Sequence, residues 1–129
     1  METLGFHHLG LAVSDLQATA KFFTDALGWS VAREVPEYPA IFVTNGTAFV
    51  TLWQTDAGAS RFDRRKNVGL HHFALRVPSE AALDAVFAKA SSHPGVRLDF
   101  APELLRGGPA KHCMIYEPSG IRVEFIWAP

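Results

Sequence analysis

FHHLGLAVSDL (residues 6–16) is followed half a chain later by LHHFALRVPSE (residues 70–80), and this repetition decides the fold. In each stretch, two adjacent histidines come first and apolar residues then alternate with small or polar ones, which is the side-chain period of a β-strand. A serine that can cap a helix follows, at Ser14 and Ser79, ahead of apolar residues at helical spacing. The sequence therefore predicts a duplicated unit in which a strand runs into a helix.

Short β-rich runs follow each predicted helix. They cover about 29–35, 40–44 and 47–54 in the first half and about 96–100, 111–116 and 121–127 in the second. Turns are expected at Asn45-Gly46 and over residues 117–120, and the polar segment 56–69 is expected to be a linker. The predicted fold class is α+β, with two βαβββ modules at about 4–55 and 70–128 inside a single domain, 1–129.

The composition limits the functions that this chain can have. Its 12 basic and 13 acidic side chains nearly balance, so we expect no nucleic-acid partner. No apolar run approaches the ~20 residues of a membrane span, and no signal peptide is visible. The one cysteine, Cys113, excludes an internal disulfide and suits a reducing compartment, so the expected location is the cytoplasm.

Strand alternation places three possible metal ligands on faces that no helix covers. His8 shares its face with Gly10 and Ala12, away from the leucines of the same strand. His72 follows the same rule in the second half, and Glu124 lies inside the apolar run IRVEFIW, where a carboxylate needs a partner. Two imidazoles and one carboxylate form the facial triad that holds Fe(II) with open positions. Each histidine taken alone is more simply read as a packed or exposed residue, and this reading is kept for the preceding histidine of each pair.

The motifs HHLGLAVSDL with KFFTDALGW, LHHFALRV, and YEPSGIRVEFIW together resemble the vicinal oxygen chelate superfamily. This superfamily includes glyoxalases, bleomycin-resistance proteins and extradiol dioxygenases. The resemblance implies a cup-shaped mixed sheet around a metal bound by His8, His72 and Glu124. It favours Fe(II) or Mn(II), with Zn(II), Ni(II) or Co(II) as alternatives. It also implies a homodimer in which subunits can share the metal site.

The chain departs from several branches of that superfamily. Glyoxalase I has a glutamate ligand late in its first half, where this sequence has Thr51, or Val50 in another alignment. The glutamine of related epimerases has Gln54 as its nearest counterpart, which is expected on the opposite face of the strand. Extradiol dioxygenases place an acid–base histidine in this region, and TAFVTLWQT contains none. Gly10 replaces the threonine of fosfomycin-resistance enzymes, so a fosfomycin substrate is not expected.

Other residues are candidates for proton transfer and substrate binding. We expect His112 to be the general acid–base and Tyr116 to donate a hydrogen bond to a bound oxyanion. For each of them, a purely structural role is the alternative. The segment 104–109, which contains two adjacent glycines and precedes the His112 strand, is expected to be a lid whose Arg106 closes on the ligand, or else a plain surface loop. The predicted substrate pocket consists of Phe49, Thr51, Trp53, Arg76, Arg106 and Arg122. For the two aromatic residues a plain core role is the alternative, and for Arg76 and Arg122 the alternative is an ion pair with Glu124 or with a solvent-facing carboxylate.

The leading prediction is a divalent-metal-dependent, dioxygenase-like enzyme that acts on a small substrate with vicinal oxygens. A glyoxalase-like lyase or an epimerase/isomerase is the first alternative. The second is a metal-free, bleomycin-type protein that binds small molecules. The sequence does not identify the substrate or the metal.

Overall fold

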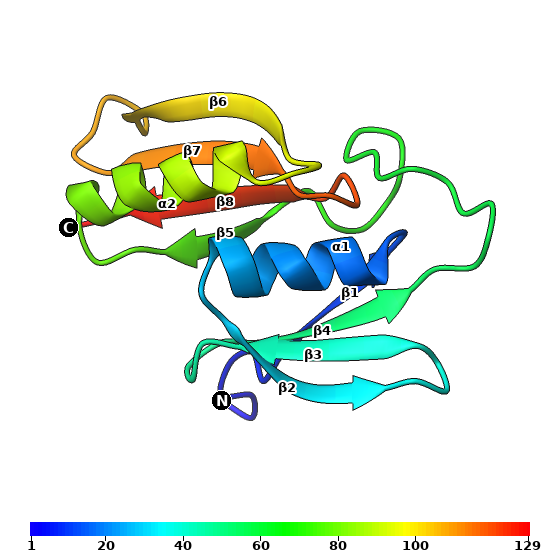
Figure 1. Cartoon of the computed structure of the whole chain (residues 1–129). Coiled ribbons are helices and arrows are strands. Elements are labelled where there is room, and N and C mark those ends of the chain that lie inside the picture. The colour runs from blue at the N-terminus through cyan, green and yellow to red at the C-terminus, as the bar shows by residue number, and fades with distance from the viewer. The chain divides into compact units, whose positions relative to one another are not determined.

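The computed structural model describes residues 1–129 and divides into two compact units, Met1–Ala59 and Ser60–Pro129. The boundary falls inside the predicted linker 56–69. Each unit has the order βαβββ and one four-stranded mixed sheet, which confirms the α+β prediction (Figure 1). None of the helices combines the length and the apolar character needed to cross a bilayer.

The first unit contains β1 (Leu9–Val13), α1 (Leu16–Lys21), the π-helical turn η1 (Phe22–Ala26), β2 (Ser30–Val35), β3 (Ala40–Thr44) and β4 (Phe49–Gln54). Its strand order is β1-β4-β3-β2, with β1 parallel to β4 and the other pairs antiparallel. The helix packs on β3 and β4. In β1, Leu11 and Val13 are buried whereas Gly10 and Ala12 are exposed, so the predicted alternation is confirmed.

The start of α1 differs from the prediction by one residue. Asp15, not Ser14, is the N-cap, and its carboxylate accepts a hydrogen bond from the Ala18 amide at 3.0 Å. The Leu16 amide donates to the side-chain oxygen of Gln54 at 3.1 Å. A residue from β4 therefore satisfies one free N–H group of the helix, which sequence spacing alone cannot show.

The second unit contains β5 (Phe73–Arg76), α2 (Glu80–Ser92), β6 (Arg97–Leu104), β7 (Lys111–Tyr116) and β8 (Arg122–Trp127). Its strand order, β5-β8-β7-β6, repeats that of the first unit, with β5 parallel to β8. Strand β6 extends beyond the predicted 96–100. The turn over residues 117–120 forms as expected, because the Gly120 amide donates to the Glu117 carbonyl and Gly120 has a φ of 88°.

Helix α2 covers one face of this second sheet (Figure 1). Its predicted cap is confirmed, since the Ser79 hydroxyl accepts a hydrogen bond from the Ala82 amide at 3.0 Å. Leu83 of the helix, and Cys113 and Val123 of the sheet, are fully buried. Burial raises the pKa of the Cys113 thiol to about 12, because a thiolate would lose its hydration there. The other face of the sheet is therefore the one available for chemistry.

Candidate functional site

Strand pairing in the second unit aligns polar side chains on the face opposite α2. Met114 of β7 and Ala74 of β5 both pair with Glu124 of β8, and His112 pairs with Ile126. Residues with even numbers on β7 and β8 therefore share one face. Small Ala74 leaves room for the carboxylate beside it.

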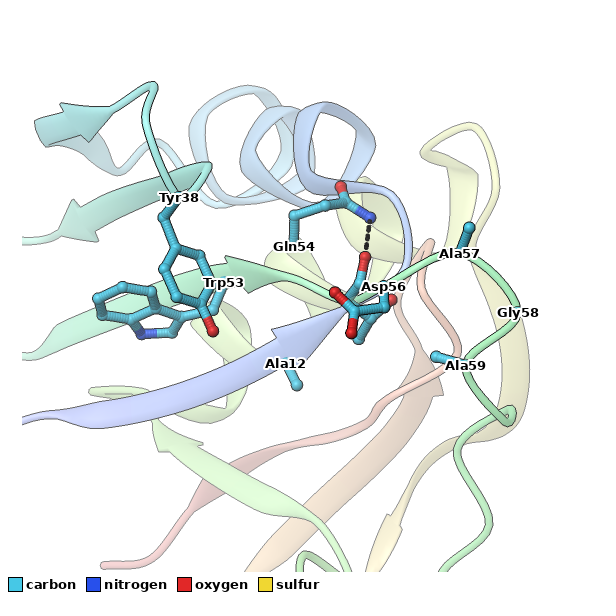
Figure 2. A pocket seen from close by; sticks show the side chains of 9 residues that line it. Ala12, Tyr38, Trp53, Gln54, Asp56, Ala57, Gly58 and Ala59 are labelled. Atoms are coloured by element: carbon cyan, nitrogen blue, oxygen red, sulfur yellow. Dashed lines mark hydrogen bonds between the residues drawn. The ribbon is translucent and has the colours of Figure 1, made fainter.

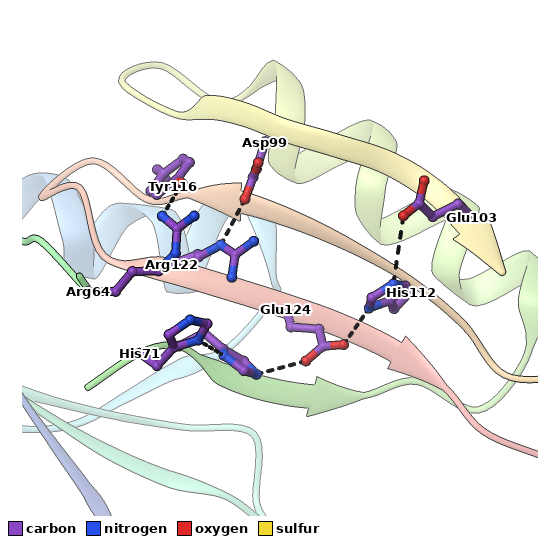
Figure 3. Close-up of polar contacts among 9 residues, drawn as sticks. Arg64, His71, Asp99, Glu103, His112, Tyr116, Arg122 and Glu124 are labelled. Atoms are coloured by element: carbon purple, nitrogen blue, oxygen red, sulfur yellow. Dashed lines mark hydrogen bonds and ion pairs between the residues drawn. The ribbon is translucent and has the colours of Figure 1, made fainter. Parts of the chain in front are cut away.

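Glu124 is the buried centre of a polar cluster whose His72 side is partly exposed (Figure 3). One carboxylate oxygen lies 3.1 Å from Nε2 of His72, and the other lies 2.7 Å from Nδ1 of His112. Glu124 is only 6% exposed, and its two imidazole partners compensate the cost of burying the carboxylate. The structure thus brings together the predicted ligands of the second unit, and it adds the predicted acid–base residue to them.

The three-ligand metal set remains a prediction. His8 belongs to the first unit and lies immediately before β1, whereas His72 and Glu124 belong to the second. Nowhere in the structure do three or more histidine, cysteine, aspartate or glutamate side chains form a group that could hold a metal ion. The structure therefore describes one pair of candidate ligands and, separately, one exposed histidine.

His112 and Tyr116 both lie on the open face of β7. The His112 ring contacts Phe100 edge-on at 4.9 Å between centroids, and its Nε2 lies 3.9 Å from the exposed Glu103 carboxylate. Tyr116 accepts a hydrogen bond from the Arg64 guanidinium at 2.8 Å. Because that bond uses a lone pair of the oxygen, the Tyr116 proton is left to donate elsewhere.

The three predicted arginines have different surroundings. Arg122 donates through Nε to Asp99 of β6 at 2.8 Å. The ion pair that was the alternative to substrate binding therefore forms, but its carboxylate belongs to Asp99 and not to Glu124. Arg76 ends β5 and is exposed. Arg106 is exposed, with a φ of 49°, in the turn between β6 and β7. The Leu105 amide donates to the Ala110 carbonyl at 2.8 Å and closes this turn as a hairpin, while the role of Arg106 as a lid stays a prediction.

The predicted pocket residues of the first unit form an aromatic group. The Trp53 indole donates to the Thr51 hydroxyl at 2.9 Å, and Phe42 packs on both Trp53 and Phe49. Gly10 makes room for this group, because a Cβ there would lie 3.3 Å from the Thr51 oxygen. Thr51 is thus a buried structural partner of the indole.

A cavity of about 480 Å³ opens beside Trp53 in the same unit (Figure 2). Tyr38 packs edge-on against Trp53 at 4.7 Å between centroids, and Asp56 adds a carboxylate to the wall. Neither Tyr38 nor Asp56 was predicted, because they lie in a hairpin and a linker that carry no periodic signal. Of the three first-unit pocket residues, only Trp53 lines this cavity.

Gln54 has a structural role. Its side-chain oxygen binds the Leu16 amide, and its side-chain nitrogen donates to the carbonyls of Ser14 at 2.8 Å and Thr55 at 3.3 Å. Its oxygen and its bond to Ser14 join β4 to the start of α1, while the bond to Thr55 is local. This agrees with its predicted place on the face opposite Thr51.

The histidine before each candidate ligand contacts that ligand. Nδ1 of His7 lies 2.9 Å from Nδ1 of His8, and Nδ1 of His71 lies 2.7 Å from Nδ1 of His72. Partial desolvation, followed by the positive charges of His72, Arg122 and the nearby arginines, lowers the pKa of His71. The neutral imidazole is therefore favoured at this position.

Comparisons with known proteins agree with the fold. Residues 5–125 match the family model described as Glyoxalase/Bleomycin resistance protein/Dioxygenase superfamily. A glyoxylase/bleomycin resistance protein/dioxygenase domain from Frankia sp. EAN1pec is similar in structure, with a TM-score of 0.84, 21% identity, and coverage of 99% of this chain and 100% of that one. A lactoylglutathione lyase from Agrobacterium tumefaciens has a TM-score of 0.73, 19% identity, and coverage of 99% and 96%. A comparison with curated proteins finds no match.

Proposed function

Because this chain belongs to the Glyoxalase/Bleomycin resistance protein/Dioxygenase superfamily, we propose that it is a divalent-metal-dependent enzyme that acts on a small substrate with two neighbouring oxygens. One observation carries the proposal. Glu124 is buried and its two oxygens are held by His72 and His112 at 3.1 and 2.7 Å. A buried carboxylate between two imidazoles is costly to build for stability alone, and is typical of functional sites.

The spacing of the two candidate ligands in the second unit supports this proposal. Bonds from a divalent first-row ion to imidazole nitrogen and carboxylate oxygen are about 2.1 Å long. Two such bonds at a right angle place their donor atoms about 3 Å apart. The observed 3.1 Å between His72 Nε2 and Glu124 Oε2 agrees with this value. His8 is the proposed third ligand, and Fe(II) or Mn(II) is the proposed ion, with Zn(II), Ni(II) or Co(II) as alternatives.

When bound, such an ion supplies a Lewis acid with open positions, where a chelating substrate can carry negative charge. His112 fixes the orientation of Glu124 through Nδ1, which leaves Nε2 as the nitrogen that can exchange a proton with a substrate. Tyr116, already bonded to Arg64, keeps its hydroxyl proton available for an oxyanion. These residues supply orientation and proton transfer.

We propose dioxygenase-like cleavage as the leading reaction, because two imidazoles and one carboxylate are the ligand set of non-haem Fe(II) oxygenases. A glyoxalase-like lyase or an epimerase is the alternative reaction. Two contacts weigh against it, because they occupy the residues that stand where glyoxalase I has its glutamate ligand and where the epimerases have their glutamine. The Thr51 hydroxyl is bonded to the Trp53 indole, and Gln54 joins β4 to α1. We further propose a homodimer that can share the site, acting in the cytoplasm.

The cavity beside Trp53 favours a second candidate function, binding of a small planar molecule without a metal. Its wall combines the rings of Tyr38 and Trp53 with the Asp56 carboxylate, which suits an aromatic cation. Under this alternative, the cluster at Glu124 has no role in binding. A ligand of that chemistry would lose affinity in Trp53→Ala and keep it in Glu124→Gln.

The test is metal stoichiometry. We expect the purified chain, reconstituted with Fe(II) or Mn(II) under anaerobic conditions, to retain one ion per site. His72→Ala and Glu124→Gln should each weaken retention at least tenfold. His93→Ala, which alters a histidine at the end of α2, is the matched control and should bind like the parent. Failure of all five candidate ions to bind, or equal binding by His72→Ala and the parent, would refute metal dependence.

The reaction is then tested with the loaded protein. Oxygen uptake with catechols under Fe(II) supports the dioxygenase-like proposal. Turnover of a hemithioacetal under Ni(II) or Zn(II), without oxygen uptake, would instead assign the lyase alternative.

A further inference from the structure

Guanidinium groups gather at one end of the open face of the second sheet. Strand pairing puts Arg97 of β6, Tyr116 of β7 and Arg122 of β8 in one row, because Arg97 pairs with Tyr116 and Tyr116 pairs with Arg122. Neighbouring side chains in such a row have Cβ atoms about 5 Å apart. Arg64, from the segment before β5, joins the row by donating to the Tyr116 hydroxyl at 2.8 Å. Three guanidinium groups therefore surround one phenol ring.

Two of these three guanidinium groups contact the ring and no carboxylate. Arg97 lies over the face of Tyr116, with its central guanidinium carbon 3.9 Å from the ring centroid. Arg64 bonds to the uncharged hydroxyl of the same ring. The ion pairs of the chain include neither of them. Positive charges that converge in this way repel one another, and an anion bound among them would relieve that repulsion.

The third guanidinium group, that of Arg122, is held in one orientation. Its side chain is only 11% exposed, and its Nε donates to Asp99 at 2.8 Å. Asp99 is the extra residue of a β-bulge, since the β6 residues on either side of it pair with consecutive residues of β7. A bulge can redirect a side chain, and here it brings the carboxylate to Arg122. The two terminal nitrogens of Arg122 make no hydrogen bond within the chain and are not cut off from solvent, so they can still donate to an oxyanion.

The arginine row lies at a definite distance from the proposed metal site. Arg122 and Glu124 are two residues apart on the same face of β8, which corresponds to about 7 Å along the strand. Figure 3 shows Arg122 with its bond to Asp99, and Glu124 further along the same strand. A single substituted ring can span this distance. A molecule with two neighbouring oxygens at Glu124 can therefore place an anionic group among the arginines.

We propose that Arg64, Arg97 and Arg122 form a subsite for an anionic oxygen group of the substrate, a carboxylate or a phosphate. Three guanidinium groups and the one carboxylate of Asp99 leave an excess of two positive charges there. Tyr116 is a positioning residue of this subsite, because it acts through Arg64. The proposal rests on the proposed function for the place of the chelating oxygens, whereas binding of the anion itself requires only the arginines.

The first experiment uses metal-free protein at low ionic strength. Benzoate and phenyl phosphate are the anionic probes, and benzyl alcohol is the uncharged one. We expect an anion, and not the alcohol, to shift the Nε–H signals of Arg97 and Arg122 in ¹H–¹⁵N spectra. The anion that binds more tightly identifies the group. Arg64→Gln and Arg97→Gln should each weaken binding about tenfold.

Lys89→Gln is the matched control, because it removes an exposed positive charge from α2, on the other face of the same sheet. This variant should bind both anions like the parent. If neither anion shifts the arginine signals, or if Arg64→Gln and Arg97→Gln bind as tightly as Lys89→Gln, the subsite does not exist.

Tyr116→Phe tests positioning without changing the charge of the protein. The variant keeps the ring beneath Arg97 but removes the hydroxyl that holds Arg64. We expect weaker anion binding, and we expect Tyr116→Phe to add nothing further in a protein that already carries Arg64→Gln. Fully additive losses would overturn the positioning role, because Tyr116 would then act independently of Arg64.

The second experiment links the subsite to the reaction. In protein loaded with Fe(II), 3,4-dihydroxybenzoate should have a KM at least about tenfold below that of its methyl ester, and Arg97→Gln should remove this difference. Equal KM values for the acid and the ester in the parent would overturn the assignment of the subsite to the substrate. If no candidate ion binds, the proposed function fails, while anion binding by the metal-free protein still supports the subsite.

Discussion

Glu124→Gln tests the central contact of the second unit through stability. The substitution keeps the size of the side chain but replaces one acceptor oxygen by an NH₂ donor. Of His72 and His112, one keeps its contact with the remaining oxygen, and the other then faces the new NH₂ group. Hydrogen bonds to charged groups contribute about 1.5–3 kcal/mol each, so we expect the metal-free protein to lose about 2 kcal/mol of unfolding free energy. The glutamate is only 6% exposed, so water cannot replace the lost partner.

This loss is large enough to measure by melting. At about 2.1 cal/mol/K per residue, the 129 residues have an unfolding entropy of roughly 0.27 kcal/mol/K, so 2 kcal/mol lowers Tm by about 7 °C. The assay is circular dichroism of metal-free protein, with urea unfolding as a second measure. Glu103→Gln is the control: this carboxylate is 60% exposed and 3.9 Å from His112, so its loss should change stability by less than about 0.5 kcal/mol. A Glu124→Gln variant as stable as the parent would show that the two imidazole contacts do not hold this carboxylate.

Three further predictions concern single contacts. Asp15→Ala should lower the unfolding free energy measured in urea by about 1 kcal/mol, because the N-cap is lost, whereas Ser14→Ala should lower it by less than about 0.5 kcal/mol. A larger loss in Ser14→Ala than in Asp15→Ala would show that Ser14 is the cap. Gln54→Ala should cost about 2 kcal/mol in the same assay, because it removes the hydrogen-bond partner of the Leu16 amide and of the Ser14 and Thr55 carbonyls. A change under about 0.5 kcal/mol would contradict this. Cys113 should resist iodoacetamide in the native protein and react in urea, and rapid native labelling would refute its burial. Its pKa is raised from 9.0 to about 12, so its contribution to stability is complete below pH 9 and is lost as the pH rises towards 12.

Local sequence signals predicted most of the fold. Helix α2 and its Ser79 cap, the hairpin turn at Gly46 and the βαβββ order of each unit all follow from side-chain period and turn chemistry. These features depend on residues a few positions apart, and short-range geometry is what a sequence displays directly. The cap of α1 was wrong by one residue, because both Ser14 and Asp15 can cap a helix. A contact from Gln54, 38 positions after Leu16, also supports this helix start, and no local pattern reveals it.

The sequence by itself determined which residues share a face of a strand, because alternation requires only the strand and not its neighbours. It therefore placed His72 and Glu124 on the open face of the second sheet. Only the tertiary structure decided that the other Glu124 oxygen is held by His112, that Arg122 pairs with Asp99, and that the paired histidines face each other through Nδ1. These contacts depend on strand register and on side-chain rotamers, which are set by packing between segments far apart in the chain.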